Sequence, residues 1–341
     1  MNKSRLLGSL LILASFAAAE GDAYLGEVQA GVRAFEAGTL DQAVTHFARA
    51  RQMNAKDWRG HAWHSMTVLR QATGTRNRTR RLALAGEAKQ LAAQLIKSAG
   101  LKFNDPLYNY LTGLADSLHG RTSQALTSLS RAYGASLPRY SPYREIGLRD
   151  LVSRAFAHAT IDGAVGLLFR GEFERAEPML QVAAKALPQN DGGWILLHRN
   201  FAVVDESLGR YEAAIDRLEK CLKMEPPPAL REELQASIAV IYAKNKQLKE
   251  AAKALAAIPK ESRHIDVIAA RATVKKLAAL RDPRGAAMED ALVFFRGEMK
   301  TYPEKELYRL VEDFAELVLA RVERPQLEKE RPLVDEAMTL L

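Results

Sequence analysis

The stretch GEFERAEPMLQVAAKALP, residues 171–188, decides the fold, because residues 209–226 repeat its pattern as GRYEAAIDRLEKCLKMEP. Both stretches begin with glycine, carry alanine, leucine and a second small residue at fixed intervals, and end with proline. Two further copies of the pattern begin at Gly38 and Gly120. Copies in one register indicate an internal repeat, which has to be recognised before any single site is interpreted. The copies share these positions: Gly38, Ala43, Phe47, Ala50 and Ala55; Gly120, Ala125, Leu129, Ala132 and Leu137; Gly171, Ala176, Leu180, Ala183 and Pro188; Gly209, Ala214, Leu218, Cys221 and Pro226.

Each copy predicts a pair of helices joined by a tight turn. The glycine ends the first helix in a backbone conformation that is costly for other residues, and the proline stops the second helix. A small residue precedes each glycine by seven positions, which allows helix axes to approach to about 8–10 Å. These small residues are Gly31, Gly113, Ala164 and Ala202.

The pattern resembles the tetratricopeptide repeat family, whose signature has a small residue in the first helix, Ala-x3-Phe in the second and a closing proline. The resemblance covers most of residues 24–260 and implies an all-α, right-handed superhelix of about six to seven hairpins with C-terminal capping helices. It also implies a protein-binding scaffold whose first helices line a concave groove. Departures occur where tyrosine is usual in the first helix: Ala34, Asp116, Leu167 and Asp205.

Irregular spacing between the copies predicts insertions near residues 73–86 and 140–156. The first insertion follows a helix expected at 58–72 and precedes one carrying Ala92 and Ile96. Residues 20–260 are thus expected to form the repeat array, with Lys246 at the glycine position of a degenerate sixth unit. Residues 261–341 are expected to form an irregular pair around Ala291, a helix over 304–322 and a short cap after Pro332.

The N-terminus has the composition of a secretory signal peptide, residues 1–19. Lys3 and Arg5 precede an apolar run that ends in Ala17, Ala18 and Ala19. This run is shorter than the roughly 20 residues that a membrane-spanning helix needs. We therefore expect cleavage after Ala19 and export to a periplasm, with secretion as the alternative and no transmembrane anchor after cleavage. The only cysteine is Cys221, so neither a lipid anchor nor an internal disulfide is expected.

Charge and composition indicate an elongated helical protein with a basic N-terminal part. Apolar residues make up 48% of the 341 residues and aromatic residues only 7%, which favours helices throughout. The net charge is +8, and residues 20–160 hold 19 Lys and Arg against 11 Asp and Glu. Residues 161–341 hold 28 against 30. A chain of this length exceeds one ordinary core, so its core is expected to grow along one axis.

The sequence contains none of the common motifs for metalloproteases, α/β-hydrolases, phosphate loops or cysteine-pair metal sites. We expect no enzyme activity, no cofactor and no metal. His61 and His64 lie three residues apart and could share a metal, but packed histidines are the favoured interpretation. Cys221 replaces alanine in the repeat and is expected to be a small buried side chain.

Two candidate binding surfaces remain. An apolar groove is expected either to hold a peptide or helix of another protein, within a cell-envelope assembly, or to be filled by the chain's own helices. A basic patch is expected either to be a solvated loop or to bind an acidic glycan or peptidoglycan, and nucleic acid is not expected as a partner. The groove residues are Val28, Val32, Phe35, Leu107, Tyr110, Leu114, Leu118, Ile161, Val165, Leu168 and Phe169, and the basic patch is Arg70, Arg76, Arg78, Arg80 and Arg81.

Overall fold

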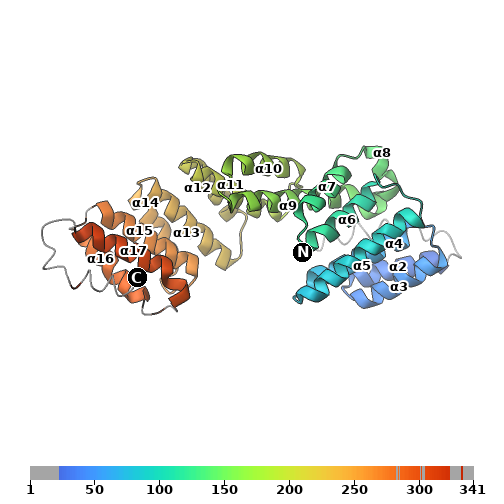
Figure 1. Ribbon diagram of the computed structural model, residues 1–341, viewed down its shortest axis with the longest axis horizontal. Coiled ribbons are helices and arrows are strands. Elements are labelled where there is room, and N and C mark those ends of the chain that lie inside the picture. Colours follow the sequence, from blue (N-terminus) through green and yellow to red (C-terminus); the bar gives the residue numbers. More distant parts are fainter. Residues whose placement is uncertain are drawn as a thin grey trace. The chain divides into compact units, whose positions relative to one another are not determined.

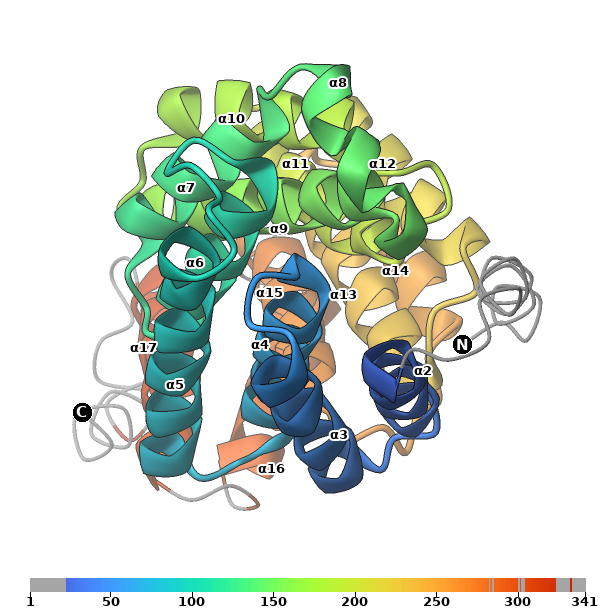
Figure 2. The same ribbon diagram turned by 90° about the vertical axis from the view of Figure 1, so that its right-hand side faces the viewer.

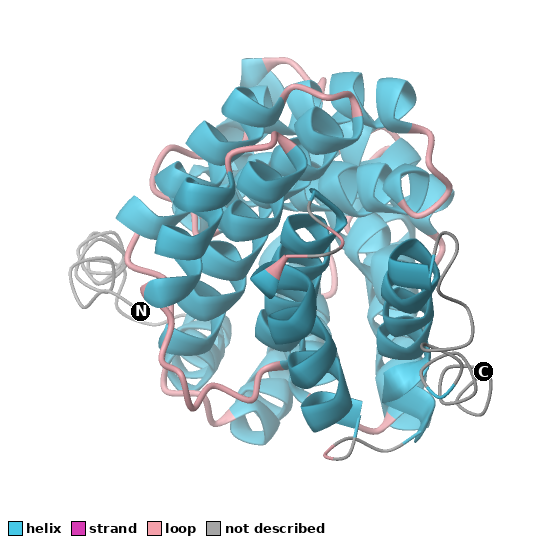
Figure 3. Ribbon diagram, turned by 90° about the vertical axis from the view of Figure 1, so that its left-hand side faces the viewer, coloured by secondary structure: helices cyan, strands magenta, loops and turns pink. Residues whose placement is uncertain are grey.

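The computed structural model describes residues 23–281, 283, 285–299, 301, 304–322 and 332. The predicted signal peptide and the cap expected after Pro332 lie outside the described residues. Within this part of the chain every regular element is a helix (Figures 1 and 3). The chain divides into two compact units, Met1–Trp194 and Ile195–Leu341. None of the described helices combines the length and apolar character needed to cross a membrane.

The first unit is a stack of helical hairpins. Successive helices pack in the pairs α2–α3, α4–α5, α6–α7 and α9–α10, and the first helices also contact one another in the order α2, α4, α6, α9 (Figure 2). The helices of this unit are α2 (Ala23–Glu36), α3 (Leu40–Met53), α4 (Trp58–Gly74), α5 (Arg78–Lys97), α6 (Pro106–Leu118), α7 (Thr122–Tyr133), α8 (Leu137–Tyr140), the 3-10 helix η2 (Ser141–Ile146), α9 (Leu148–Leu168) and α10 (Phe173–Ala186).

The second unit continues the pairing. Ala202 of α11 and Ala214 of α12 belong to one buried cluster, and α13 packs against α14 as α15 packs against α16. The predicted array of hairpins and the predicted helix over 304–322 are both confirmed. The helices are α11 (Gly193–Ser207, which begins at the boundary of the units), α12 (Tyr211–Lys223), α13 (Pro228–Lys244), α14 (Leu248–Ala256), α15 (Ile265–Arg281), α16 (Ala286–Met299) and α17 (Glu304–Val322).

The hairpin turns depend on a left-handed backbone. All the repeat glycines have positive φ angles, between 72° at Gly120 and Gly171 and 80° at Gly38. Lys246 stands at the same position of the degenerate unit and adopts the same conformation, with φ 63°. Since a side chain in this region costs roughly 1–2 kcal/mol, the packing of α13 against α14 imposes the turn even without glycine.

Close contact between the two helices of a hairpin explains the small residues. A Cβ atom added at Gly31 would lie 2.5 Å from the Phe47 ring, and one added at Gly113 would lie 2.6 Å from Leu129 Cγ. Phe47 and Leu129 are the large residues of the repeat pattern in the second helix, and both are fully buried. In these two hairpins the repeat pattern therefore places a glycine of the first helix against a large side chain of the second helix.

Two of the departures from the family pattern are buried carboxylates that pair with exposed bases. Asp116 is 3% exposed and lies 2.7 Å from Lys89 Nζ on α5 and 3.6 Å from an Arg121 guanidinium nitrogen. Asp205 is 4% exposed and pairs with Arg210 at 2.8 Å. In both hairpins the arginine directly follows the turn glycine, so the pair bridges the turn where the family usually has an aromatic side chain.

The prediction of an insertion between helices at residues 73–86 is wrong. Helix α4 continues to Gly74 and α5 begins at Arg78, so the surplus residues lengthen the two helices. The Asn77 side chain caps α5 by accepting a hydrogen bond from the Arg80 N–H at 3.0 Å. The Ser65 hydroxyl on α4 donates to the Ala88 carbonyl at 3.0 Å, which fixes the extended helices against each other.

The insertion predicted near residues 140–156 consists of a short helix, a 3-10 helix and the start of a long helix. Residues 141–146 form η2, and Gly147 ends it with φ 59°. Helix α9 then begins at Leu148 and runs for 21 residues. The left-handed glycine sets the boundary, because a helix cannot continue through that conformation.

The substitution Gly113→Ala tests the hairpin contact. We expect it to lower the free energy of unfolding by about 1–3 kcal/mol because the added methyl group overpacks against Leu129. This loss exceeds the roughly 1 kcal/mol that alanine contributes through helix propensity. Urea unfolding followed by circular dichroism measures the change.

Gly86→Ala is the matched control, since no atom lies within 4 Å of a Cβ added at that position of α5. It should raise the free energy of unfolding by about 0.5–1 kcal/mol. An equal gain in stability from Gly113→Ala would contradict the proposed contact.

Candidate functional site

A groove with two adjoining cavities lies on the first helices of the hairpins in the first unit. The larger cavity has a volume of about 510 Å³ and the smaller one about 360 Å³. Both are lined by Tyr110, Leu114 and Ser117 of α6 and by Leu151 of α9, so they form one continuous depression. We call it the α6 groove.

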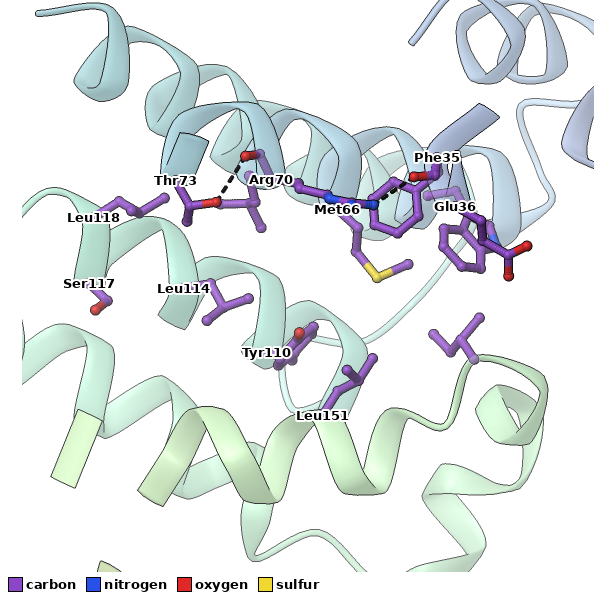
Figure 4. A pocket seen from close by; sticks show the side chains of 13 residues that line it. Phe35, Glu36, Met66, Arg70, Thr73, Tyr110, Leu114, Ser117, Leu118 and Leu151 are labelled. Atoms are coloured by element: carbon purple, nitrogen blue, oxygen red, sulfur yellow. Dashed lines mark hydrogen bonds between the residues drawn. The ribbon is translucent and has the colours of Figure 1, made fainter. Parts of the chain in front are cut away.

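Helices α4 and α6 form the opposite walls of the larger cavity. Figure 4 shows Met66 and Arg70 on α4 facing Tyr110 and Leu114 on α6, with Leu151 beyond them. Residues 63, 66, 70 and 73 of α4 all line the cavity, and this spacing places them on one face of the helix. The groove is therefore built by first helices, as the repeat predicts.

An aromatic cluster closes the α2 end of the groove. Trp63 packs edge-on against Phe35 at 5.4 Å and stacks on Phe47 at 5.9 Å between ring centroids. Arg70 lies over the Phe35 ring at 4.6 Å and donates a hydrogen bond to the Phe35 carbonyl at 2.6 Å. These contacts hold the guanidinium of Arg70 along the wall of the groove.

The α9 end of the groove carries a charged network. Arg154 and His158 both line the smaller cavity and both contact Asp191, at 2.5 and 3.3 Å. Burial favours a raised pKa for Asp191, but the Gly193 N–H and Arg154 outweigh it and lower the pKa. Asp162 lines the same cavity, where burial raises the pKa of its carboxyl and His158 partly offsets the effect.

The predicted groove residues fall into three groups. Four of them line the cavities, namely Phe35, Tyr110, Leu114 and Leu118. Four are core side chains, between 0% and 6% exposed, and are closed to a partner in this structure, namely Val28, Val32, Leu107 and Ile161. The other three line neither cavity: Val165 and Leu168 are half-buried, and Phe169 is 88% exposed.

Sequence reasoning missed Trp63, Met66 and Leu151 as lining residues. The face of α4 was not assigned because the expected insertion interrupted the repeat register there. Its spacing, an apolar residue at positions 63, 66 and 69, was the available signal. Leu151 gave no such signal, since only the fold brings the start of α9 against α6.

The basic patch divides in two. Arg70 belongs to the groove wall, whereas Arg76 precedes α5 and the other three arginines lie in the first turns of that helix. Arg76, Arg78 and Arg80 are exposed and Arg81 is half-buried. Among the residues that the structure describes, none of these four has an ion-pair partner, and the first turn of α5 has no acidic residue. We call these four residues the α5 arginines.

The two histidines are packed side chains. His61 and His64 are 2% and 5% exposed, and the Nδ1 atoms of both lie 3.1 Å from the Arg51 guanidinium. His61 also donates from Nε2 to the Ala55 carbonyl, which assigns its Nδ1 as an acceptor. No group of three or more metal-binding side chains occurs in the described part of the chain. The interpretation as packed histidines is confirmed.

Cys221 is likewise a core side chain, with 0% exposure. Its sulfur lies 3.5 Å from the Ile195 carbonyl oxygen, and burial raises the pKa of the thiol to about 11. A thiol in this state is a poor nucleophile.

His64 makes the stability of the first unit depend on pH. Burial, together with the charge of Arg51 and the neighbouring His61, lowers the pKa of His64 from 6.5 to about 4. Between these two values the unfolded chain binds a proton that the folded chain does not, so stability falls as pH falls through this range. We expect a loss of about 2 kcal/mol in the free energy of unfolding between pH 7 and pH 5 from this group.

His64→Gln should remove that part of the pH dependence, measured by urea unfolding at the two pH values. Ser65→Ala is the control, because it deletes a buried hydrogen bond in the same helix without a titrating group. Its loss of stability should be equal at both pH values. An unchanged pH dependence in His64→Gln would contradict the assignment.

Comparison with known proteins supports the repeat assignment. Residues 207–276 match the sequence model of the tetratricopeptide repeat family. The matched segment contains α12, α13 and α14 and most of α15. This segment is thus similar to tetratricopeptide repeats, and the repeat glycines at positions 38, 120, 171 and 209 share one left-handed turn conformation. No curated protein matches the chain in sequence.

Solved structures with similar helical arrangements include a tetratricopeptide repeat protein from Parabacteroides merdae, with 12% sequence identity, a TM-score of 0.43, and coverage of 93% of this chain and 100% of that chain. A second is the Rap conjugation gene regulator of the plasmid pLS20 in complex with the Phr* peptide. It has 12% identity and a TM-score of 0.38, with coverage of 99% of this chain and 90% of that chain.

Proposed function

We propose that the protein is an exported, non-enzymatic scaffold that binds a segment of another protein in the α6 groove, within a cell-envelope assembly. The observation that carries this proposal is the pair of adjoining cavities on the first helices of the hairpins. Leucine and aromatic side chains there, among them Leu114, Leu151 and Trp63, are half-buried, so part of each is open to a partner. Such a surface suits an apolar helix or extended segment.

Export is supported by the composition of residues 1–19, a basic start followed by an apolar run and small residues. The protein isolated from the cell envelope should therefore begin at Glu20, which mass spectrometry of the intact chain determines. A periplasmic location also fits a chain with a single, buried cysteine.

Blocking the groove tests the proposed function. Ser117 is exposed and lines both cavities, so Ser117→Trp should fill the groove while leaving the core packing unchanged. Leu114→Glu should place a charge against its apolar wall, at a cost of several kcal/mol to a bound apolar segment. Both variants, tagged and expressed in the native cell, should recover at least about tenfold less of the partner that the unmodified protein crosslinks.

Phe169→Glu is the matched control, because Phe169 is 88% exposed and lines neither cavity. Circular dichroism verifies that each variant is folded. Equal recovery of the partner by Ser117→Trp and by the unmodified protein would refute binding in the groove.

A second candidate function rests on the α5 arginines. Four cationic side chains within six residues repel one another, and the N-terminus of α5 adds a partial positive charge. The sequence places its next acidic residue only at Glu87. We propose that this patch binds an anionic envelope polymer, such as an acidic glycan, because guanidinium groups pair well with carboxylate and sulfate groups.

Heparin serves as a polyanionic probe for this patch. Its affinity should fall more than about tenfold between about 50 and 200 mM salt, and it should be lost when the four α5 arginines become alanine. Arg144→Ala, an exposed arginine of η2, is the control and should leave binding unchanged. Salt-independent binding, or binding that survives the fourfold substitution, would exclude this function.

A further inference from the structure

The charged residues of the α6 groove differ in whether they have partners. Among the bases, Arg70 donates to the Phe35 carbonyl and stacks on its ring, and Arg154 and His158 contact Asp191. The acids are Glu36 in the larger cavity and Asp162 in the smaller one. Within the described part of the chain, neither carboxylate has an ion-pair partner. Arg154 and His158 are thus matched by a carboxylate, whereas Arg70 is held by a neutral carbonyl and a ring. Among the described lining residues, two acids, Glu36 and Asp162, and one base, Arg70, have no opposite charge beside them.

Asp162 has no ion-pair partner among the described residues, although two bases line the same cavity. It lies on α9 one turn after His158, whose charge acts on it, but the hydrogen bonds of His158 and of Arg154 in the same cavity go to Asp191. Asp162 is exposed, so a bound segment can reach its carboxylate, and partial shielding from water raises the pKa of that carboxyl. A cation placed beside it would restore the lost stabilisation.

The apolar side chains of the groove determine which apolar side chains a bound segment needs. The two cavities share a rim formed by Leu114 and Leu151, and each is large enough for a bulky apolar side chain. A helix offers such anchors at positions i, i+3 or i+4 and i+7 on one face. Polar residues on its flanks would then lie near the two ends of the groove.

We propose that the α6 groove selects a cationic amphipathic helix, with apolar side chains in the two cavities and lysine or arginine beside Glu36 and Asp162. This inference rests on the proposed function, because it assumes that the groove binds a protein segment. The net charge of the whole chain is +8, so general attraction would favour anionic segments instead. Preference for a cationic segment would therefore come from the groove itself.

Three labelled 18-residue peptides test the inference by fluorescence anisotropy. All have leucine on one helical face, and the other face is lysine in the first, glutamine in the second and glutamate in the third. The lysine peptide should bind about threefold to tenfold more tightly than the glutamine peptide, and the glutamate peptide most weakly. Tightest binding of the glutamate peptide, or equal binding of all three, would overturn the inference.

Substitution of Glu36 and Asp162 tests whether their carboxylates cause the preference for the lysine peptide. Glu36→Gln and Asp162→Asn should each weaken the lysine peptide about threefold and leave the glutamine peptide unchanged. Glu174→Gln is the control, because Glu174 is an exposed acid on α10 that lines neither cavity. An effect of Glu174→Gln as large as that of Asp162→Asn would refute the assignment.

Ser117→Trp separates the inference from the proposed function. It should abolish binding of the lysine and glutamine peptides alike, since it fills both cavities. If none of the three peptides binds the unmodified protein, the proposed function itself fails. If they bind in the groove without regard to charge, only the inference about the cationic partner fails.

Discussion

Two helices can pack as a tight hairpin only when one of them presents a side chain small enough to admit the other. In this protein the contact is closest at Gly31 and Gly113, where a single added carbon would lie 2.5 and 2.6 Å from the Phe47 ring and from Leu129 Cγ. The large side chain of the second helix fills the space left by the glycine, and both contribute to the core. The stacking of first helices, and hence the groove, depends on this spacing, because a wider hairpin would displace α4 relative to α6.

The hairpin geometry is kept at positions where the residue type departs from the repeat pattern. At Lys246 a side chain adopts the left-handed turn that glycine usually makes, with φ 63°. At Asp116 and Asp205 a buried carboxylate paired with a basic side chain replaces an aromatic residue. Each carboxylate lies near two basic side chains, Lys89 and Arg121 for Asp116 and Arg210 and Arg217 for Asp205, so the loss of one base leaves the other in place.

The first unit carries two candidate surfaces of different character. The α6 groove is lined mainly by apolar side chains, with both acids and bases among its polar residues, whereas the α5 arginines form a cationic cluster at the start of a helix. Arg70 was grouped with the cluster by its position in the sequence, but it lies along the groove because its guanidinium contacts Phe35. Proximity in sequence is thus a poor guide to which charges act together, since side-chain direction is set by the helix face.

The sequence by itself determined the hairpins, their turns, the packed state of Cys221 and the helix over 304–322, because these follow from local periodicity and from the conformational limits of glycine and proline. The register of the repeat assigns a face to each first helix, and Phe35, Tyr110, Leu114 and Leu118 on those faces line the two cavities. Only the tertiary structure decided that Val28, Val32, Leu107 and Ile161 are core, that α4 and α5 absorb the surplus residues and that Leu151 completes the groove. These outcomes depend on which neighbouring helix covers a given face, and contacts between distant segments leave no periodic signal in either one.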